Sequence, residues 1–119
     1  MSLNTLIDME NFEEMLNEMG NNLTLTFIGR AIKEAEETLA ATATSGDRTE
    51  LAEQAHQAIG STGLTGLTTL SLSLRSLEQA LRRSQEIENH RNELSIALLK
   101  TKEALRTLEQ RQSQANPPR

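Results

Sequence analysis

The residue whose type and surroundings could support chemistry is His56, one of two histidines in the 119-residue chain. A histidine with an ordinary pKa of about 6.5 is largely neutral near pH 7, so a free ring nitrogen can act as a nucleophile or a base. His56 lies in the stretch AHQAIGSTGLTGL, residues 55–67, where Gly60, Gly63 and Gly66 recur every three residues. Because a glycine inside a helix costs roughly 0.5–1 kcal/mol relative to alanine, this repeat needs a physical reason.

A helical wheel offers one reason for the glycines. At 100° per residue, Gly60 lies about 40° from His56, and Gly63 lies about 20° away on the other side. Ala52 falls on the same face one turn earlier. The imidazole would then stand among residues with almost no side chains, and a flat partner surface could reach it. Alternatively, the glycines end the helix and permit close packing while His56 is structural, and the wheel leaves both interpretations open.

The elements that must hold this stretch follow from the spacing of apolar residues and from the helix-capping signals. Aspartate is a typical helix N-cap, Gly20-Asn21 is a typical C-terminal signal, and Asp47 and Glu50 have the spacing of a capping box. Five helices are expected: one from Asp8 to Gly20, one from about Leu23 to Ala43, one after Asp47, one with the leucines from Leu67 to Leu81, and one with the leucines from Leu94 to Leu108.

The linkers between these helices are short, so consecutive helices are expected to be antiparallel neighbours. The expected fold is all-α, an antiparallel up-and-down four-helix bundle with a short additional N-terminal helix. A chain of 119 residues fits one domain, which we assign to residues 1–109. Residues 110–119 are polar and contain both prolines, Pro117 and Pro118, so we expect a disordered tail there.

Composition narrows the functions open to such a bundle. The chain has two phenylalanines, no tyrosine, no tryptophan and no cysteine, and its net charge is −5. Base stacking requires aromatic faces, and nucleic-acid backbones and anionic membranes require a basic surface, so these partners are disfavoured. Without cysteine there is no disulfide or thiolate metal site, and no apolar run is long enough to span a bilayer. We therefore expect a cytoplasmic protein that does not insert into membranes.

Two sequence motifs support a more specific interpretation. HQAIGSTG, residues 56–63, begins nine residues after Asp47, and SLEQAL, residues 76–81, places Glu78 twenty-two residues after His56. With the number and order of the helices, these motifs resemble the histidine phosphotransfer (HPt) family of two-component phosphorelays. In that family, H-x-x-K-G and small residues mark the phospho-accepting helix, and the next helix carries a leucine seam with a Leu-Glu pair. The resemblance spans about residues 6–108.

The resemblance implies roles for the residues of both motifs. His56 would be the phospho-acceptor, and Glu78 would orient its imidazole. The partner-docking residues would be Ala52, Gln57, Gly60 and Gly63.

One position departs from the family pattern. The lysine that usually follows the histidine by three residues is Ile59 here, so the charge that this lysine can offer to the phosphoryl group is absent from that position. Arg75, one turn before Glu78 on the same expected helix, is the candidate source of positive charge near the phosphoryl group. His90, the other histidine, is expected on the surface.

The function that the resemblance implies is that of a phosphorelay carrier, rather than a self-sufficient enzyme. It would accept a phosphoryl group from a receiver-domain aspartate and pass it to a response regulator. The implied partners are response-regulator receiver domains and a hybrid histidine kinase. No cofactor is expected in this chain, because Mg²⁺ would belong to the partner receiver domain.

Other functions remain open beside the carrier. An HPt-like adaptor that binds receiver or kinase partners without being phosphorylated is favoured by Ile59. An enzyme that uses His56 as a general base lacks a second catalytic group in the motif. A metal or haem site is disfavoured, since two histidines on different helices and no cysteine form no ligand set.

Overall fold

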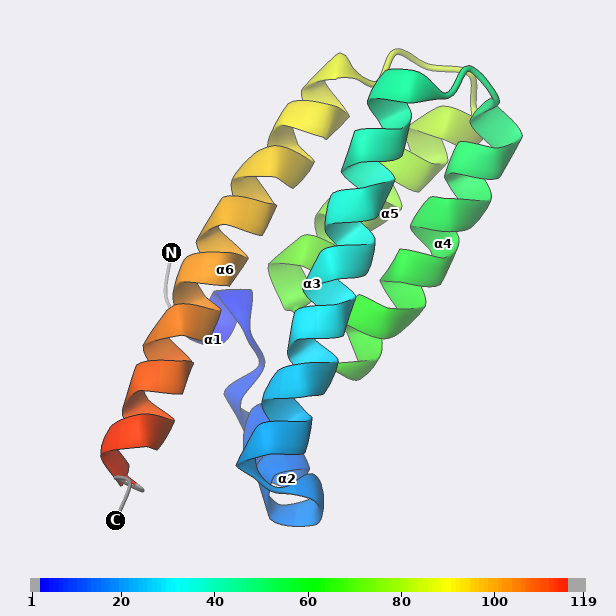
Figure 1. Cartoon of the computed structure of the whole chain (residues 1–119). Helices are drawn as coiled ribbons and strands as arrows, with labels where there is room; N and C mark the ends of the chain where they lie inside the picture. The colour runs from blue at the N-terminus through cyan, green and yellow to red at the C-terminus, as the bar shows by residue number, and fades with distance from the viewer. Residues whose placement is uncertain (1–2, 116–119) are drawn as a thin grey trace.

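The computed structural model describes residues 3–115, and within that range it contains helices and short connections but no strand. Figure 1 shows the arrangement of the helices. They are α1 (Leu3–Leu6), α2 (Met9–Met19), α3 (Asn21–Thr44), α4 (Arg48–Leu64), α5 (Thr68–Arg82) and α6 (Glu88–Ala115). The predicted all-α class is confirmed.

Local capping explains where the helices begin and end. The Asp8 carboxylate accepts a hydrogen bond from the Asn11 N–H at 3.2 Å, which caps α2. The Asp47 carboxylate caps α4 by accepting from the second and third backbone N–H groups of that helix, at 3.0 and 3.1 Å. Gly20, with φ 80°, separates α2 from α3. The predicted boundaries at Asp8, Gly20 and Asp47 are therefore confirmed.

One detail of the expected capping box differs. The backbone N–H of Asp47 donates to the Ser45 hydroxyl oxygen at 3.2 Å, so serine takes the place expected for the Glu50 carboxylate. Ser45 is the C-cap of α3, and its own N–H donates to the carbonyl oxygen of Ala41. The connection between α3 and α4 is therefore tied at both ends by short-range hydrogen bonds.

Four long helices pack in pairs to form the body of the protein. Helix α4 contacts α3 and α5, and α6 contacts the same two helices. Figure 1 shows that the chain direction alternates from α3 through α6. The leucine seam faces inward, because all its members are at most 2% exposed: Leu67, Leu70, Leu74, Leu77 and Leu81. This seam anchors α5 between α4 and α6, which places one side of α5 beside the His56 helix.

The N-terminal segment closes one end of this body. Helix α1, which the sequence did not predict, contacts α5 and α6, and the Ile7 side chain after it is fully buried. The Asp8 N–H donates to the carbonyl oxygen of Gly66 at 2.8 Å, and the Asn11 side-chain amide donates to that of Leu64 at 3.2 Å. The segment therefore ties the α4–α5 turn in place.

The expected disordered tail is corrected for part of its length. Helix α6 continues to Ala115 instead of ending near residue 109. Residues 110–115 contain glutamine, arginine and alanine, which are good helix formers, and no proline occurs before Pro117. The rest of the predicted tail, residues 116–119, lies outside the described residues, as do residues 1–2 of the predicted domain.

None of the described helices is both long and apolar enough to cross a membrane. Among residues 3–115, no three His, Asp or Glu side chains gather closely enough to hold a metal ion.

Candidate functional site

His56 projects from the outer side of α4. The opposite side of this helix enters the core, where Leu51, Ala55, Ala58 and Thr62 are at most 3% exposed. The His56 side chain is 71% exposed. Because the Asp47 cap fixes where α4 starts, and the apolar residues fix which side turns inward, the helix presents the imidazole to solvent.

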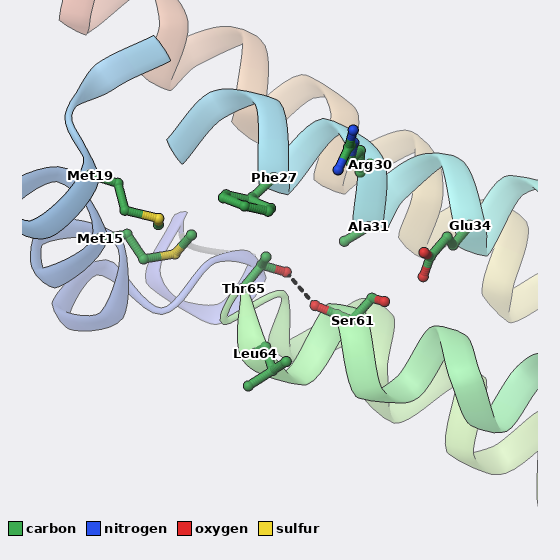
Figure 2. A pocket seen from close by; sticks show the side chains of 9 residues that line it. All are labelled: Met15, Met19, Phe27, Arg30, Ala31, Glu34, Ser61, Leu64 and Thr65. Atoms are coloured by element: carbon green, nitrogen blue, oxygen red, sulfur yellow. Dashed lines mark hydrogen bonds between the residues drawn. The ribbon is translucent and has the colours of Figure 1, made fainter. Parts of the chain in front are cut away.

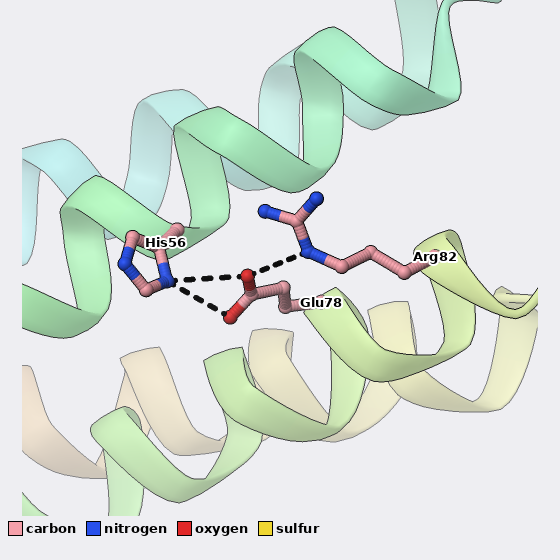
Figure 3. Close-up of polar contacts among 3 residues, drawn as sticks. All are labelled: His56, Glu78 and Arg82. Carbon is pink, nitrogen blue, oxygen red and sulfur yellow. Dashed lines mark hydrogen bonds and ion pairs between the residues drawn. The ribbon is translucent and has the colours of Figure 1, made fainter.

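The structure brings Glu78 of α5 to this imidazole. The Nδ1 atom of His56 lies 3.3 Å from Oε1 and 3.2 Å from Oε2 of Glu78, as Figure 3 shows. A carboxylate can only accept, so the neutral ring must carry its proton on Nδ1, and Nε2 keeps its lone pair. In Figure 3 the second ring nitrogen lies on the side of the ring away from Glu78. The contact therefore favours the tautomer in which Nδ1 carries the proton and the exposed Nε2 can act as a nucleophile.

Arg82 completes a short chain of polar contacts. Its Nε donates to Oε2 of Glu78 at 2.9 Å, one turn along α5. Burial, which leaves the Glu78 side chain 15% exposed, raises the pKa of this carboxyl. The hydrogen bonds and positive charges of Arg82 and His56 outweigh burial, so the pKa of Glu78 is lowered from its ordinary value of 4.5. Glu78 is therefore ionised near neutral pH and ready to accept from the imidazole.

The three glycines of the motif separate into two kinds. Gly66 has φ 72°, and a Cβ there would lie 2.9 Å from the Asn11 amide nitrogen, so the turn after α4 requires glycine. Gly60 and Gly63 are exposed, and a Cβ added at either would meet nothing within 4 Å. Close helix packing therefore does not explain Gly60 and Gly63, which leave open surface beside His56. Gln57 is also exposed.

One predicted docking residue is wrong. Ala52 is fully buried, so it offers nothing to a partner. On the wheel it lies between the side of His56 and the side of Ala55, which is also fully buried. A methyl group at that border is too short to emerge past the neighbouring helices, whereas the imidazole one turn later does emerge. The docking face is therefore smaller than the sequence suggested.

Arg75, the candidate source of positive charge, forms no hydrogen bond or ion pair with His56 or Glu78 among the described residues. Arg75 is exposed and makes no hydrogen bond or ion pair with any described residue. It lines a shallow surface pocket with Gly63 and Ser71. Both Arg75 and Arg82 lie about one turn from Glu78, but only Arg82 pairs with its carboxylate. Ile59, three residues after His56, is half-buried against the core and provides no charge.

Sequence reasoning missed an apolar cleft of about 430 Å³ between α2, α3 and α4. Figure 2 shows Met15, Met19, Phe27 and Leu64 around it. Phe27 is 38% exposed and Leu64 is 82% exposed, although both are large and apolar. The helical wheel could have predicted the exposure of Leu64, since this residue lies about 80° from His56 and therefore away from the buried side of α4.

The other histidine differs from expectation as well. His90 is half-buried rather than exposed, and its Nδ1 is enclosed without a hydrogen-bond partner among the described residues. His90 lies near the start of α6, whereas His56 lies in the middle of α4. The two histidines therefore occupy unlike environments.

No family model matches the chain, and neither a curated protein nor a solved structure matches it significantly. The function must therefore be inferred from the chemistry that the site can perform. That chemistry is nucleophilic attack by an exposed imidazole whose tautomer is held by an ionised carboxylate.

Proposed function

We propose that this protein is a histidine phosphotransfer carrier that accepts a phosphoryl group on His56 and passes it on. The observation that carries the proposal is the contact between Nδ1 of the 71%-exposed His56 and the Glu78 carboxylate. A phospho-acceptor must meet a donor held on another protein, so the ring must be exposed. It must also present a lone pair, which the Glu78 contact provides at Nε2.

The proposed transfer requires little of this chain beyond positioning. Nε2 attacks the phosphorus of an aspartyl phosphate on a receiver domain, the N–P bond forms, and the bond from phosphorus to the aspartate oxygen breaks. The aspartate leaves as a carboxylate. Nδ1 keeps its proton, so the ring gains positive charge, which the Glu78 carboxylate stabilises. Mg²⁺ would be supplied by the receiver domain, where it would neutralise charge on the phosphoryl group.

The architecture we propose is the antiparallel up-and-down four-helix bundle of HPt domains, formed by α3 to α6. The helix pairs in contact and the alternating chain direction support it. The short additional N-terminal helix of this architecture would be α2. In this arrangement His56 and Glu78 lie on adjacent helices, which is the relation that the two sequence motifs suggest.

The proposed partners are a hybrid histidine kinase and response-regulator receiver domains in the cytoplasm. Their docking would use the open surface at Gly60 and Gly63 beside the imidazole, with Gln57 at its edge. Because neither glycine adds a side chain, a partner carrying the donor aspartate can approach the ring closely. A bulky side chain at either position would stand in its way.

A second candidate is an HPt-like adaptor that binds such partners without being phosphorylated. Two observations favour it: Ile59 replaces the family's lysine, and the exposed Arg75 makes no ion pair that would hold it near the ring. The adaptor would use the same docking surface and would leave His56 unmodified. The carrier and the adaptor therefore differ in one measurable property, the phosphorylation of His56.

Incubation with a receiver domain phosphorylated by a small phosphodonor tests the proposal. We expect phosphate on this chain that is labile in acid and stable in base, as a phosphohistidine is. His56→Gln should abolish it and leave thermal stability near wild type, because the side chain is mostly exposed. His90→Gln is the matched control and should still be labelled. Labelling that survives in His56→Gln would refute the assignment, and binding without any labelling would favour the adaptor.

A further inference from the structure

Arg48, the first residue of α4, fastens the start of that helix to the end of α5. Its Nε donates to the carbonyl oxygen of Leu81 at 3.3 Å, and its Nη2 donates to that of Ala80 at 3.1 Å. Nη2 also donates to the carbonyl oxygen of Gln85. The last carbonyl groups of a helix have no partner within the helix, and a guanidinium carries five donors in a fixed plane. One side chain thus binds three acceptors on the neighbouring helix end.

The helix end that Arg48 binds is itself well defined. The Gln85 N–H donates to the carbonyl oxygen of Ala80 at 2.9 Å, and the Ser84 N–H donates to that of Leu81 at 3.4 Å. Ser84 has φ 56°, so the chain turns back through the left-handed conformation that typically ends a helix. Arg48 is therefore attached to a closed turn rather than to a loose loop.

The buried side of α4 near the site offers few side chains that could prevent sliding. Its central members are Ala52, Ala55 and Ala58, each at most 2% exposed, and Leu51 and Thr62 flank them. Small side chains allow two helices to approach closely, but they form low ridges that interlock weakly. The register of α4 against α5 at the site is therefore held from the two ends of the helix pair, by the short turn of residues 65–67 at one end and by Arg48 at the other.

That register decides whether Glu78 reaches His56. Arg48 lies eight residues before His56, which is about 12 Å along α4. A slide of about 2.7 Å, half the pitch of a helix, would carry Nδ1 and the carboxylate beyond hydrogen-bond distance. The three contacts of Arg48 oppose such a slide, because each would be broken by it.

We propose that Arg48 is a positioning residue for His56: by clamping α4 to α5 at the end opposite their short connecting turn, it maintains the helix register in which Glu78 holds Nδ1. Its consequence for phosphotransfer rests on the proposed function. The effect on the imidazole itself does not, since the tautomer of the ring can be observed without any phosphoryl donor.

The test measures the tautomer of His56 by long-range ¹H–¹⁵N spectra of protein labelled with ¹⁵N-histidine, at about pH 9, where histidine is neutral. The spectrum of His56→Gln contains only His90 and therefore assigns the signals. In Arg48→Met, the ratio of Nδ1–H to Nε2–H tautomer should fall about two- to tenfold, the factor that a modest hydrogen bond provides. Arg48→Lys keeps the charge but lacks the planar fork, so the ratio should be intermediate.

Arg91→Met is the matched control. Arg91 is also half-buried and bridges two helices, because its Nε donates to the Thr42 hydroxyl oxygen at 2.8 Å. Its loss should leave the tautomer of His56 unchanged, since it joins α6 to α3. If Arg48→Met lowers stability too far, Arg48→Met combined with Ser84→Gly restores the helix end without restoring the clamp, and the low ratio should persist.

Two results would overturn the proposal: a folded Arg48 variant with the wild-type tautomer ratio, or an equal fall in Arg91→Met. The outcome is separable from that of the proposed function. If the tautomer ratio falls in Arg48→Met but His56 never accepts phosphate, the positioning role of Arg48 is supported and the carrier function is refuted. If His56 is labelled normally but the tautomer ratio is unchanged in Arg48→Met, the carrier function is supported and the positioning role is refuted.

Discussion

Replacing Gly60 by glutamine should separate stability from function at the docking surface. A Cβ at residue 60 meets nothing within 4 Å, so the substitution introduces no clash inside the protein. Gly60 lies inside α4, where glutamine is the better helix former, so the free energy of unfolding should rise by about 0.5–1 kcal/mol. For a domain of this size, the midpoint of thermal unfolding should rise by about 2–6 °C.

The same side chain would stand one turn from His56, on the surface that a receiver domain must approach. Transfer from a phosphorylated receiver domain should fall at least about tenfold, which corresponds to about 1.4 kcal/mol of lost docking energy. Circular dichroism during heating measures the stability, and the acid-labile phosphate formed over time measures the transfer.

Gly29→Gln is the matched control for this experiment. Gly29 also lies inside a helix, and a Cβ there also meets nothing within 4 Å, but it belongs to α3. It should gain similar stability and keep normal transfer. The reasoning would be refuted by a strongly destabilised Gly60→Gln, or by a Gly60→Gln variant that transfers as fast as wild type.

Three further predictions concern α5. Burial raises the pKa of Glu78, but Arg82 and His56 lower it more, so the pKa lies below 4.5. The ionised carboxylate therefore stabilises the folded protein above about pH 4.5, and this stabilisation is lost as the pH falls through the lowered pKa. In urea unfolding at several pH values, the advantage of wild type over Glu78→Gln should therefore shrink below pH 4.5, and an advantage that grows there would contradict this sign. Arg82→Ala should shorten the phosphohistidine lifetime more than Arg75→Ala, because only Arg82 pairs with Glu78. A larger effect of Arg75→Ala would instead support Arg75 as the source of positive charge near the phosphoryl group. Ser84→Gly should raise the free energy of unfolding by about 1 kcal/mol, since serine has φ 56° there, and an unchanged denaturation midpoint would show that serine pays no penalty.

The helices themselves could be predicted because their signals are local. Asp8 and Asp47 cap helices through hydrogen bonds that span two or three residues, and Gly20 ends α2 through its own φ angle. The leucine seam of α5 was predictable for the same reason, since its spacing alone turns it inward. The end of α6 differs from the prediction because residues 110–115, although polar, are mostly good helix formers.

The site was partly predictable by the same means. The helical wheel placed His56, Gly60 and Gly63 on one face of α4, and all three are exposed. The wheel also placed Ala52 on this face, but Ala52 is buried. Exposure at the border of a face depends on the length of the side chain and on the neighbouring helix. A wheel describes one helix alone and contains no neighbour.

By itself, therefore, the sequence determined the helical class, most helix boundaries and the common face of His56, Gly60 and Gly63, because each depends on residues within a few turns of one another. Only the tertiary structure decided which residues meet across helices. Arg75 and Arg82 lie at nearly equal distances along α5 from Glu78, but the local rule favours Arg82, because a glutamate four residues before a basic residue pairs better than one that follows it. The contact of Glu78 with His56 and the contacts of Arg48 with the end of α5 join residues on different helices, so only the packing of α4 against α5 brings them together.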